Sequence, residues 1–195
     1  MTQGRIQLVP LAADTLTVAE PWFHDEQTRR WLGGPGWPAL VLRLAADPPA
    51  EFRGRRVTGR FAWLASVEGQ PVGLVEVERY ADATAGLALV VDPARRRQGL
   101  GKRIIQAVLA HPALGETELV RAGIEPDNQA SVRCFTAVGF AAETAEPDEE
   151  GVVYFRRRVH DSRVVALDAP ASPPHHRGQF DELTATDRAD HPQKS

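Results

Sequence analysis

Apolar and polar residues follow two different periods along the chain, and each change of period marks a predicted element. Residues 5–12 alternate with a period of two and predict a first strand. Residues 13–36 change to helical spacing and predict two short helices, broken around Pro21 and stopped by the glycine pair at 33–34. A third helical segment is predicted at 38–47.

The middle of the chain returns to the two-residue period of strands. Residues 55–69 and 70–80 predict a hairpin, and the wholly apolar residues 85–91 predict a buried strand. The remaining predicted elements are a helix from about residue 100, a strand at 117–124, a helix at 127–139, and a final hairpin of 140–146 with 151–159. This order gives an α/β fold with a mixed sheet.

Length and composition limit the chain to one ordinary core. Its 195 residues, 43% of them hydrophobic, suffice for one globular domain, which we place at residues 1–160. After about His160 the chain becomes rich in proline, charge and small polar residues, so a mostly disordered tail is expected at 161–195. The paired His175 and His176 of this tail are expected to be incidental, and no metal site is predicted.

Net charge and cysteine content exclude several classes of partner. The 23 basic and 26 acidic residues leave a formal charge of -3, so nothing global attracts nucleic acid or an anionic membrane. Cys134 is the single cysteine, which excludes an internal disulfide and a multi-cysteine metal site. The first residues do not resemble a signal peptide, and no apolar run reaches the ~20 residues that span a bilayer. We therefore expect a cytoplasmic protein.

Residues 90–111 carry the clearest candidate chemistry. Pro93 stops the pairing of the preceding strand, and the following turn places two glycines at the start of a helix. Such a turn collects unpaired backbone N–H groups at the positive end of a helix dipole. Five cations surround it: Arg95, Arg96, Arg97, Lys102 and Arg103. We predict a phosphate-bearing ligand; a cationic helix cap without a ligand is the alternative.

The spacing of these glycines identifies the motif. Ile104 stands where the dinucleotide-binding pattern GxGxxG needs its third glycine, and Arg96 stands where a P-loop needs its first. The remaining pattern, RRQGLG, resembles the R/QxxGxG/A turn of the Gcn5-related N-acetyltransferase (GNAT) superfamily. The resemblance implies that the pyrophosphate of acetyl-CoA is held by Arg96, Arg97, Gln98, Gly99, Leu100, Gly101 and Lys102.

A second segment, GIEPDNQASVRCFTAVGF at 123–140, resembles a later part of the same family. Asn128 and Ser131 align with it, and the resemblance places Asn128 beside the pantetheine arm; a helix N-cap is the equally open alternative. The arm is implied to pair, as an added strand, with the backbone of the strand from Leu87 to Val91, chiefly at Leu89, Val90 and Val91. The resemblance covers about residues 5–159 and implies the GNAT fold, a mixed, mostly antiparallel, splayed sheet of about seven strands with flanking helices.

One position departs from the family pattern. Many members carry a tyrosine four residues before the glycine of the GF pair, where its hydroxyl can protonate the departing CoA thiolate, and here that residue is Phe135. We expect Phe135 to line the cofactor site without supplying an acid. Water, another group, or departure as an unprotonated thiolate are the alternatives. The neighbouring Cys134 is interpreted as a buried structural thiol.

Amine acetylation also needs a base and an acceptor site. Glu76 and Glu78 alternate with valines on one strand, where the family often carries its base, so Glu76 is the first candidate and Glu78 the second. A plain solvated face is the alternative. The acceptor is expected at the N-terminal helices, although core packing explains their aromatic residues equally well. The candidates there are Trp22, His24, Asp25 and Trp31.

These features together predict an acetyl-CoA-dependent N-acetyltransferase. A small-molecule or peptide primary amine attacks acetyl-CoA directly in a ternary complex. Use of another acyl-CoA, or a CoA-binding sensor or interaction domain without turnover, are the alternatives. The sequence leaves the identity of the amine and the oligomeric state open, a homodimer included.

Overall fold

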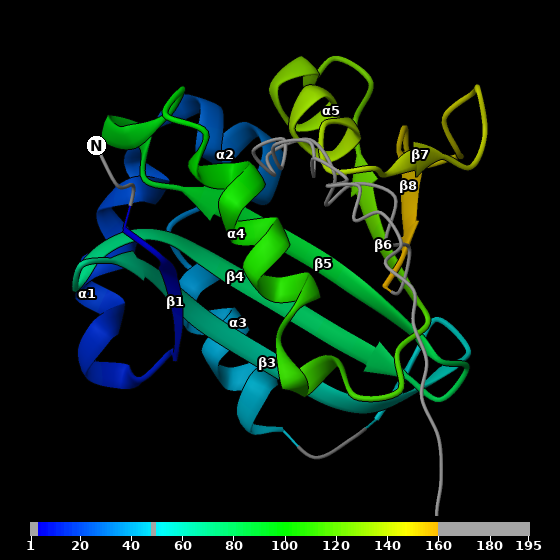
Figure 1. Ribbon diagram of the computed structural model, residues 1–195, viewed down its shortest axis with the longest axis horizontal. Coiled ribbons are helices and arrows are strands. Elements are labelled where there is room, and N and C mark those ends of the chain that lie inside the picture. The colour runs from blue at the N-terminus through cyan, green and yellow to red at the C-terminus, as the bar shows by residue number, and fades with distance from the viewer. Residues whose placement is uncertain (1–3, 48–49, 160–195) are drawn as a thin grey trace, which may run out of the picture. The chain divides into compact units, whose positions relative to one another are not determined.

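The structure is a computed structural model that describes residues 4–47 and 50–159. The predicted tail at 161–195, with its paired histidines, lies outside these residues, as does the predicted domain end at residue 160. A mixed sheet runs through the described part in the order β1-β3-β4-β5-β6-β8-β7, with β2 paired to β3 (Figure 1). The strands are β1 (Ile6–Pro10), β2 (Glu51–Phe52), β3 (Arg55–Val67), β4 (Gln70–Tyr80), β5 (Thr84–Val91), β6 (Leu119–Ile124), β7 (Ala141–Ala142) and β8 (Val153–Arg158).

The pairing confirms the predicted mixed, mostly antiparallel sheet. Every pair of neighbouring strands is antiparallel except β5 and β6, which are parallel. The described part has eight strands where the family pattern implies about seven, and the two-residue β2 accounts for the difference. Both predicted hairpins are present, although β7 contributes only two residues to the second.

Helices cover both faces of the sheet: α4 crosses the near face in Figure 1, and α3 lies behind β3. The α-helices are α1 (Leu16–Ala19), α2 (Glu26–Leu32), α3 (Trp37–Ala46), α4 (Leu100–Leu109) and α5 (Gln129–Thr136). The 3-10 helices are η1 (Ala13–Thr15), η2 (Glu20–His24), η3 (Pro93–Arg95) and η4 (Pro112–Leu114). Within the described ranges, no helix combines the length and the apolar character needed to cross a bilayer.

The α-helix α1 ends just before Pro21, as predicted, but the chain continues as the 3-10 helix η2 and leaves helical geometry only at Asp25. Pro21 occupies the first turn of η2. Its missing N–H is tolerated there because the N–H groups of a first turn have no acceptor within the helix. Asp25 is extended (φ -66°, ψ 129°), and its carboxylate accepts a hydrogen bond of 2.8 Å from the N–H of Thr28. Asp25 is therefore the N-cap of α2, and the helix ends at Gly33 (φ 90°).

Each face of the sheet has its own apolar core. On β4, Val75 and Val77 are fully buried in the core beneath α4, together with Ile104. Leu74 points to the opposite face and packs in the core beneath α1 to α3, together with Phe23. The central strands are therefore buried on both sides, as expected for a sheet covered by two helical layers.

The sheet opens between β5 and β6. Their register has only three pairs, at Thr84–Leu119, Ala85–Val120 and Gly86–Arg121. Beyond Gly86 the remaining residues of β5 have no partner on β6, although β4 continues to pair with them on the other side. The second half of β5 thus presents one unpaired backbone edge, and the splayed sheet implied by the family pattern is confirmed.

Candidate active site

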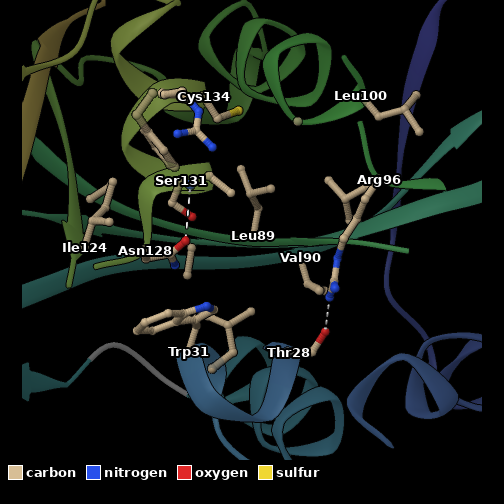
Figure 2. A pocket seen from close by; sticks show the side chains of 18 of the residues that line it. Thr28, Trp31, Leu89, Val90, Arg96, Leu100, Ile124, Asn128, Ser131 and Cys134 are labelled. Atoms are coloured by element: carbon tan, nitrogen blue, oxygen red, sulfur yellow. Dashed lines mark hydrogen bonds between the residues drawn. The ribbon is translucent and has the colours of Figure 1, made fainter. Parts of the chain in front are cut away.

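A cavity of about 810 Å³ occupies the opening between β5 and β6. Residues 87–91 of β5 and 122–125 at the end of β6 form two of its walls. Figure 2 shows the remaining walls: Leu100 of α4 and Cys134 of α5 on one side, and Thr28 and Trp31 of α2 on the other. The cavity reaches both faces of the sheet, because Leu87 belongs to the core beneath α4 and Val90 to the core beneath α1 to α3.

The glycine turn closes one end of this cavity. Arg97 (φ 62°) and Gly99 (φ 73°) both adopt left-handed backbone conformations, and α4 begins directly afterwards at Leu100. A side chain at Gly99 would meet no atom within 4 Å, so glycine is needed there for its backbone angle and not for space. The left-handed residues and the helix start form a concave set of N–H groups suited to an anion.

Most of the predicted pyrophosphate residues line the cavity. They are Arg96, Arg97, Gly99, Leu100, Gly101 and Lys102. Gln98 is exposed and is not among the lining residues. The side chain of Arg96 extends away from the turn, and its Nη2 donates to Asp25 and Thr28 of the α2 start at 2.6 Å each. Most of the guanidinium is therefore engaged by the start of α2, and the backbone of Arg96 remains available to a phosphate.

Asn128 directly precedes α5. Its Oδ1 accepts a hydrogen bond of 3.2 Å from the N–H of Ser131, so its N-cap role is confirmed. Both residues also line the cavity, which keeps the contact with the pantetheine arm open to Asn128 through its NH₂ group.

The helices α4 and α5 approach closely at Gly101 and Cys134. A Cβ at Gly101 would lie 2.8 Å from the Cys134 Sγ, closer than side-chain atoms are found. Cys134 is half-buried against the core beneath α4 and also lines the cavity. Burial raises the pKa of its thiol, although the charge of Lys102 acts in the opposite direction. The thiol is therefore neutral at pH 7 and fits the packing role predicted for it.

Phe135 lines the cavity where many family members carry tyrosine. It is buried, and its ring packs edge-to-face on Phe140 with centroids 5.0 Å apart. The sequence contains two tyrosines, Tyr80 and Tyr154, and neither lines the cavity. The cavity thus has no phenol to act as an acid.

Glu76 and Glu78 lie on the face of β4 that is turned toward the N-terminal helices. Burial, and secondarily the charge of Glu78, raises the pKa of Glu76 to about 7. Its carboxylate has no hydrogen-bond or ion-pair partner among the described residues. Its neighbour on β5 is Ala88, which lines the cavity, so Glu76 lies one strand from the cavity wall.

Glu78 differs from Glu76 because both of its oxygens have partners. The Nε of Arg60 donates to one oxygen at 2.7 Å, and the hydroxyl of Tyr80 donates to the other at 2.5 Å. The side chains of Arg60 and Glu78 are only 10% and 17% exposed. This largely buried ion pair engages Glu78, whereas Glu76 is the one of the two candidates without a hydrogen-bond partner in the described part of the chain.

Of the four predicted acceptor residues, only Trp31 lines the cavity. Trp22 is 7% exposed and packs in the core beneath α1 to α3, as the packing alternative allowed. His24 is exposed, and the carboxylate of Asp25 is held by Arg96. Three of the four candidates are thus outside the cavity.

Several cavity residues were missed by the sequence analysis. They include Gln27, Thr28, Leu32, Glu125 and Arg133. Thr28 and Leu32 share one side of α2 with the predicted Trp31, so helical spacing could have indicated these two. Within residues 4–47 and 50–159, no three His, Cys, Asp or Glu side chains gather in a way that could hold a metal ion.

Comparison with known proteins gives a consistent result. The sequence model of the acetyltransferase (GNAT) family matches residues 21–140. An uncharacterized N-acetyltransferase of Bacillus subtilis (strain 168), YfmK, is 33% identical over 141 residues, which are 70% of this chain and 85% of that protein. The mycothiol acetyltransferase of Clavibacter sepedonicus is 35% identical over 89 residues, which are 46% of this chain but 22% of that protein.

Solved structures share the fold at low identity. The structure of AAC(6')-Ib in complex with paromomycin and acetyl-CoA has a TM-score of 0.66 and 16% identity, covering 85% of this chain and 99% of that one. The fold, the open sheet and the glycine turn agree with the family match, which spans more than half of the 195 residues. The chain therefore belongs to the GNAT family and is an acetyl-CoA-dependent N-acetyltransferase.

Proposed function

We propose that acetyl-CoA binds in the cavity between β5 and β6 and that a primary amine approaches its thioester from the side of α2. The observation that carries the proposal is the opening itself, which joins the glycine turn on one face of the sheet to Trp31 on the other. A donor bound along the opening presents its acyl group where the two faces meet. The same cavity can then hold both substrates at once.

The residues around the cavity match the parts of acetyl-CoA. The N–H groups of the turn, with its left-handed Arg97 and Gly99, suit the pyrophosphate. The unpaired backbone edge of residues 87–91 can pair with the amides of the pantetheine arm as an added strand would. Lys102 and Arg133, both exposed and both at the cavity, add positive charge for the phosphates.

Glu76 is the proposed base. An ammonium ion cannot attack, so a proton must leave the nitrogen before or during attack on the thioester carbonyl. Glu76 accepts it, directly or through water, as the C–N bond forms and the C–S bond breaks. A carboxyl pKa of about 7 favours this role, because the group is partly ionised at neutral pH and is a stronger base than an ordinary glutamate.

The departing thiolate has no tyrosine to protonate it, because Phe135 occupies that position. It leaves as the anion or takes its proton from water, which the thiol pKa of roughly 8.5 permits near neutral pH. Phe135 is also the observation that favours the second candidate function, a CoA-binding sensor without turnover.

A comparison of Glu76→Gln with Glu78→Gln tests the assignment. Both changes keep the side-chain shape and remove one carboxylate, but only Glu76 is placed as the base. We expect Glu76→Gln to lower kcat by about a hundredfold while the Kd for acetyl-CoA stays near wild type. Thiol release is measured with a panel of aminoglycosides, polyamines, amino-acid derivatives and peptide N-termini, and with acetyl-CoA and succinyl-CoA as donors.

The outcomes separate the candidates. Acetyl-CoA binding without thiol release from any amine would support the sensor instead of the enzyme. A larger kcat defect in Glu78→Gln than in Glu76→Gln would reverse the assignment of the base. A defect confined to the KM of the amine would show that Glu76 binds the cationic acceptor without taking its proton.

A further inference from the structure

Arg96 belongs to two sites at once. Its backbone is part of the glycine turn, and its guanidinium contacts the start of α2, 71 residues away in the sequence (Figure 2). Nη2 donates to the carboxylate of Asp25 and to the hydroxyl of Thr28, each at 2.6 Å, and Nη1 donates to the Oε1 of Gln27 at 2.8 Å. We call these four side chains the Arg96 clamp.

The clamp is partly shielded from water. Thr28 is 3% exposed, and the side chains of Arg96 and Asp25 are 29% and 30% exposed. The hydrogen bond from Arg96 is the main cause that lowers the pKa of Asp25, so the pair stays charged at neutral pH. Because Asp25 also caps α2 through the N–H of Thr28, the guanidinium holds the first turn of the helix.

A second contact of α2 provides a comparison. Arg30 pairs with Asp127, which precedes α5, at 2.5 Å, but both side chains are 62% exposed. Exposed ion pairs of this kind contribute little because water and salt screen them. The clamp, with three hydrogen bonds from one guanidinium and a buried threonine, is the stronger link between α2 and a wall of the cavity.

We propose that Arg96 is a positioning residue that couples occupation of the CoA turn to the order of α2, the helix that forms the acceptor side of the cavity. The inference rests on the donor site of the proposed function. A pyrophosphate that fixes the turn also fixes the backbone of Arg96, and the clamp passes this restriction to α2, which carries Trp31. By linkage, an acceptor that orders α2 increases the affinity for CoA by the same factor by which CoA increases the affinity for the acceptor.

The opposing role for Arg96 is direct contact between its guanidinium and the pyrophosphate. In that case Asp25 competes with the ligand, and removing the charge of Asp25 would tighten CoA binding. In the coupling role the same change weakens the link to α2. Two conservative variants separate these roles: Asp25→Asn keeps a good N-cap without the charge, and Arg96→Lys keeps the charge without the fork of donors.

Hydrogen exchange of the full chain, with and without desulfo-CoA, tests the coupling. In the wild type we expect the ligand to slow exchange in the turn, at residues 97–103, and to slow the amides of α2 by about fivefold or more. In Arg96→Lys and Asp25→Asn the turn should stay protected while the slowing in α2 is lost. Asp127→Asn, which breaks only the exposed pair, should behave like the wild type. Melting temperatures without ligand show whether each variant is folded.

The proposal is overturned if α2 remains ligand-protected in both clamp variants, or if Asp127→Asn loses the effect as they do. It is also overturned if Asp25→Asn binds desulfo-CoA more tightly while Arg96→Lys binds it more weakly. If desulfo-CoA slows exchange in the turn of the wild type but not in α2, the coupling is rejected and the donor site stands. No protection in the turn rejects the donor site as well, so the two failures are distinguishable.

Discussion

At the scale of single residues, the contrast between Glu76 and Glu78 shows how environment divides two like groups into different roles. They are two residues apart on β4 and face the same side. Glu78 has an arginine and a tyrosine hydroxyl as partners, whereas Glu76 lies between Ala62 and Ala88, which offer no side-chain donor. A buried carboxylate without a donor favours its protonated form, and this is a stability cost that a structural residue would avoid.

This cost predicts a pH-dependent effect of Glu76→Gln on stability. The pKa of Glu76 rises from 4.5 to about 7 on folding, so between these values the folded chain holds more protons than the unfolded chain. The free energy of unfolding therefore falls as pH rises through that window, by up to about 3 kcal/mol. Glu76→Gln removes this loss, so the variant should exceed the wild type in stability at pH 8 and come close to it near pH 4.

Urea unfolding at both pH values measures the difference. Glu78→Gln is the matched control: it leaves the largely buried Arg60 guanidinium without a carboxylate partner and should be less stable than the wild type at pH 8. A difference between Glu76→Gln and the wild type that does not change with pH would contradict the raised pKa.

At the scale of elements, the two glycines of the turn serve different physical purposes. Gly99 has open space around it and a φ of 73°, so it is required for its backbone angle. Gly101 is helical, and its missing Cβ lets α4 approach α5 at Cys134. The motif that indicates the ligand site therefore also sets the packing of two cavity walls.

Gly101→Ala should accordingly be destabilising, despite the better helix propensity of alanine. The new methyl group would lie 2.8 Å from the Cys134 Sγ, so the Cys134 side chain must leave its rotamer or one helix must move. We expect a loss of about 1–3 kcal/mol in the free energy of unfolding. Adding Cys134→Ala removes the obstructing sulfur, so the double variant should be more stable than the sum of the single changes predicts.

Chemical unfolding of the four proteins in this cycle gives the coupling energy. Gly34→Ala is a suitable control, because a Cβ there meets no atom within 4 Å and its φ lies outside the left-handed region. It should leave stability almost unchanged. Strictly additive effects of Gly101→Ala and Cys134→Ala would show that the helices do not meet in this way.

At the scale of the whole molecule, features set by local sequence could be predicted, whereas features set by tertiary contacts could not. The order of strands and helices and the glycine turn follow from periodicity and spacing within short segments, and the structure confirms them. The link from Arg96 to Asp25 joins residues 71 apart, and nothing local to either indicates the other. The sequence therefore suggested an acceptor contact for Asp25, whereas in the structure Asp25 caps α2 and pairs with Arg96.

The core beneath α4 joins both sides of the open sheet. It contains Trp63 and Val75 from the strands before the opening, and Ile124, Phe135 and Phe155 from the elements after it. Only three residue pairs connect β5 to β6, and this core adds side-chain packing between the two sides. We therefore expect them to unfold together, in one cooperative transition.

A ligand that bridges the opening should stabilise this single transition as a whole. Binding only to the folded chain adds about 2.7 kcal/mol to the free energy of unfolding when CoA is present at 100 times its Kd. All four tryptophans precede β4, so their fluorescence reports on one side of the opening, whereas far-UV circular dichroism reports on both. The two signals should give coincident curves, shifted equally by CoA.

Gly99→Val, which places a β-branched residue at a φ of 73°, should lose most of this shift. If CoA moves the fluorescence curve but leaves a separate dichroism transition in place, the two sides unfold independently and the ligand does not bridge them.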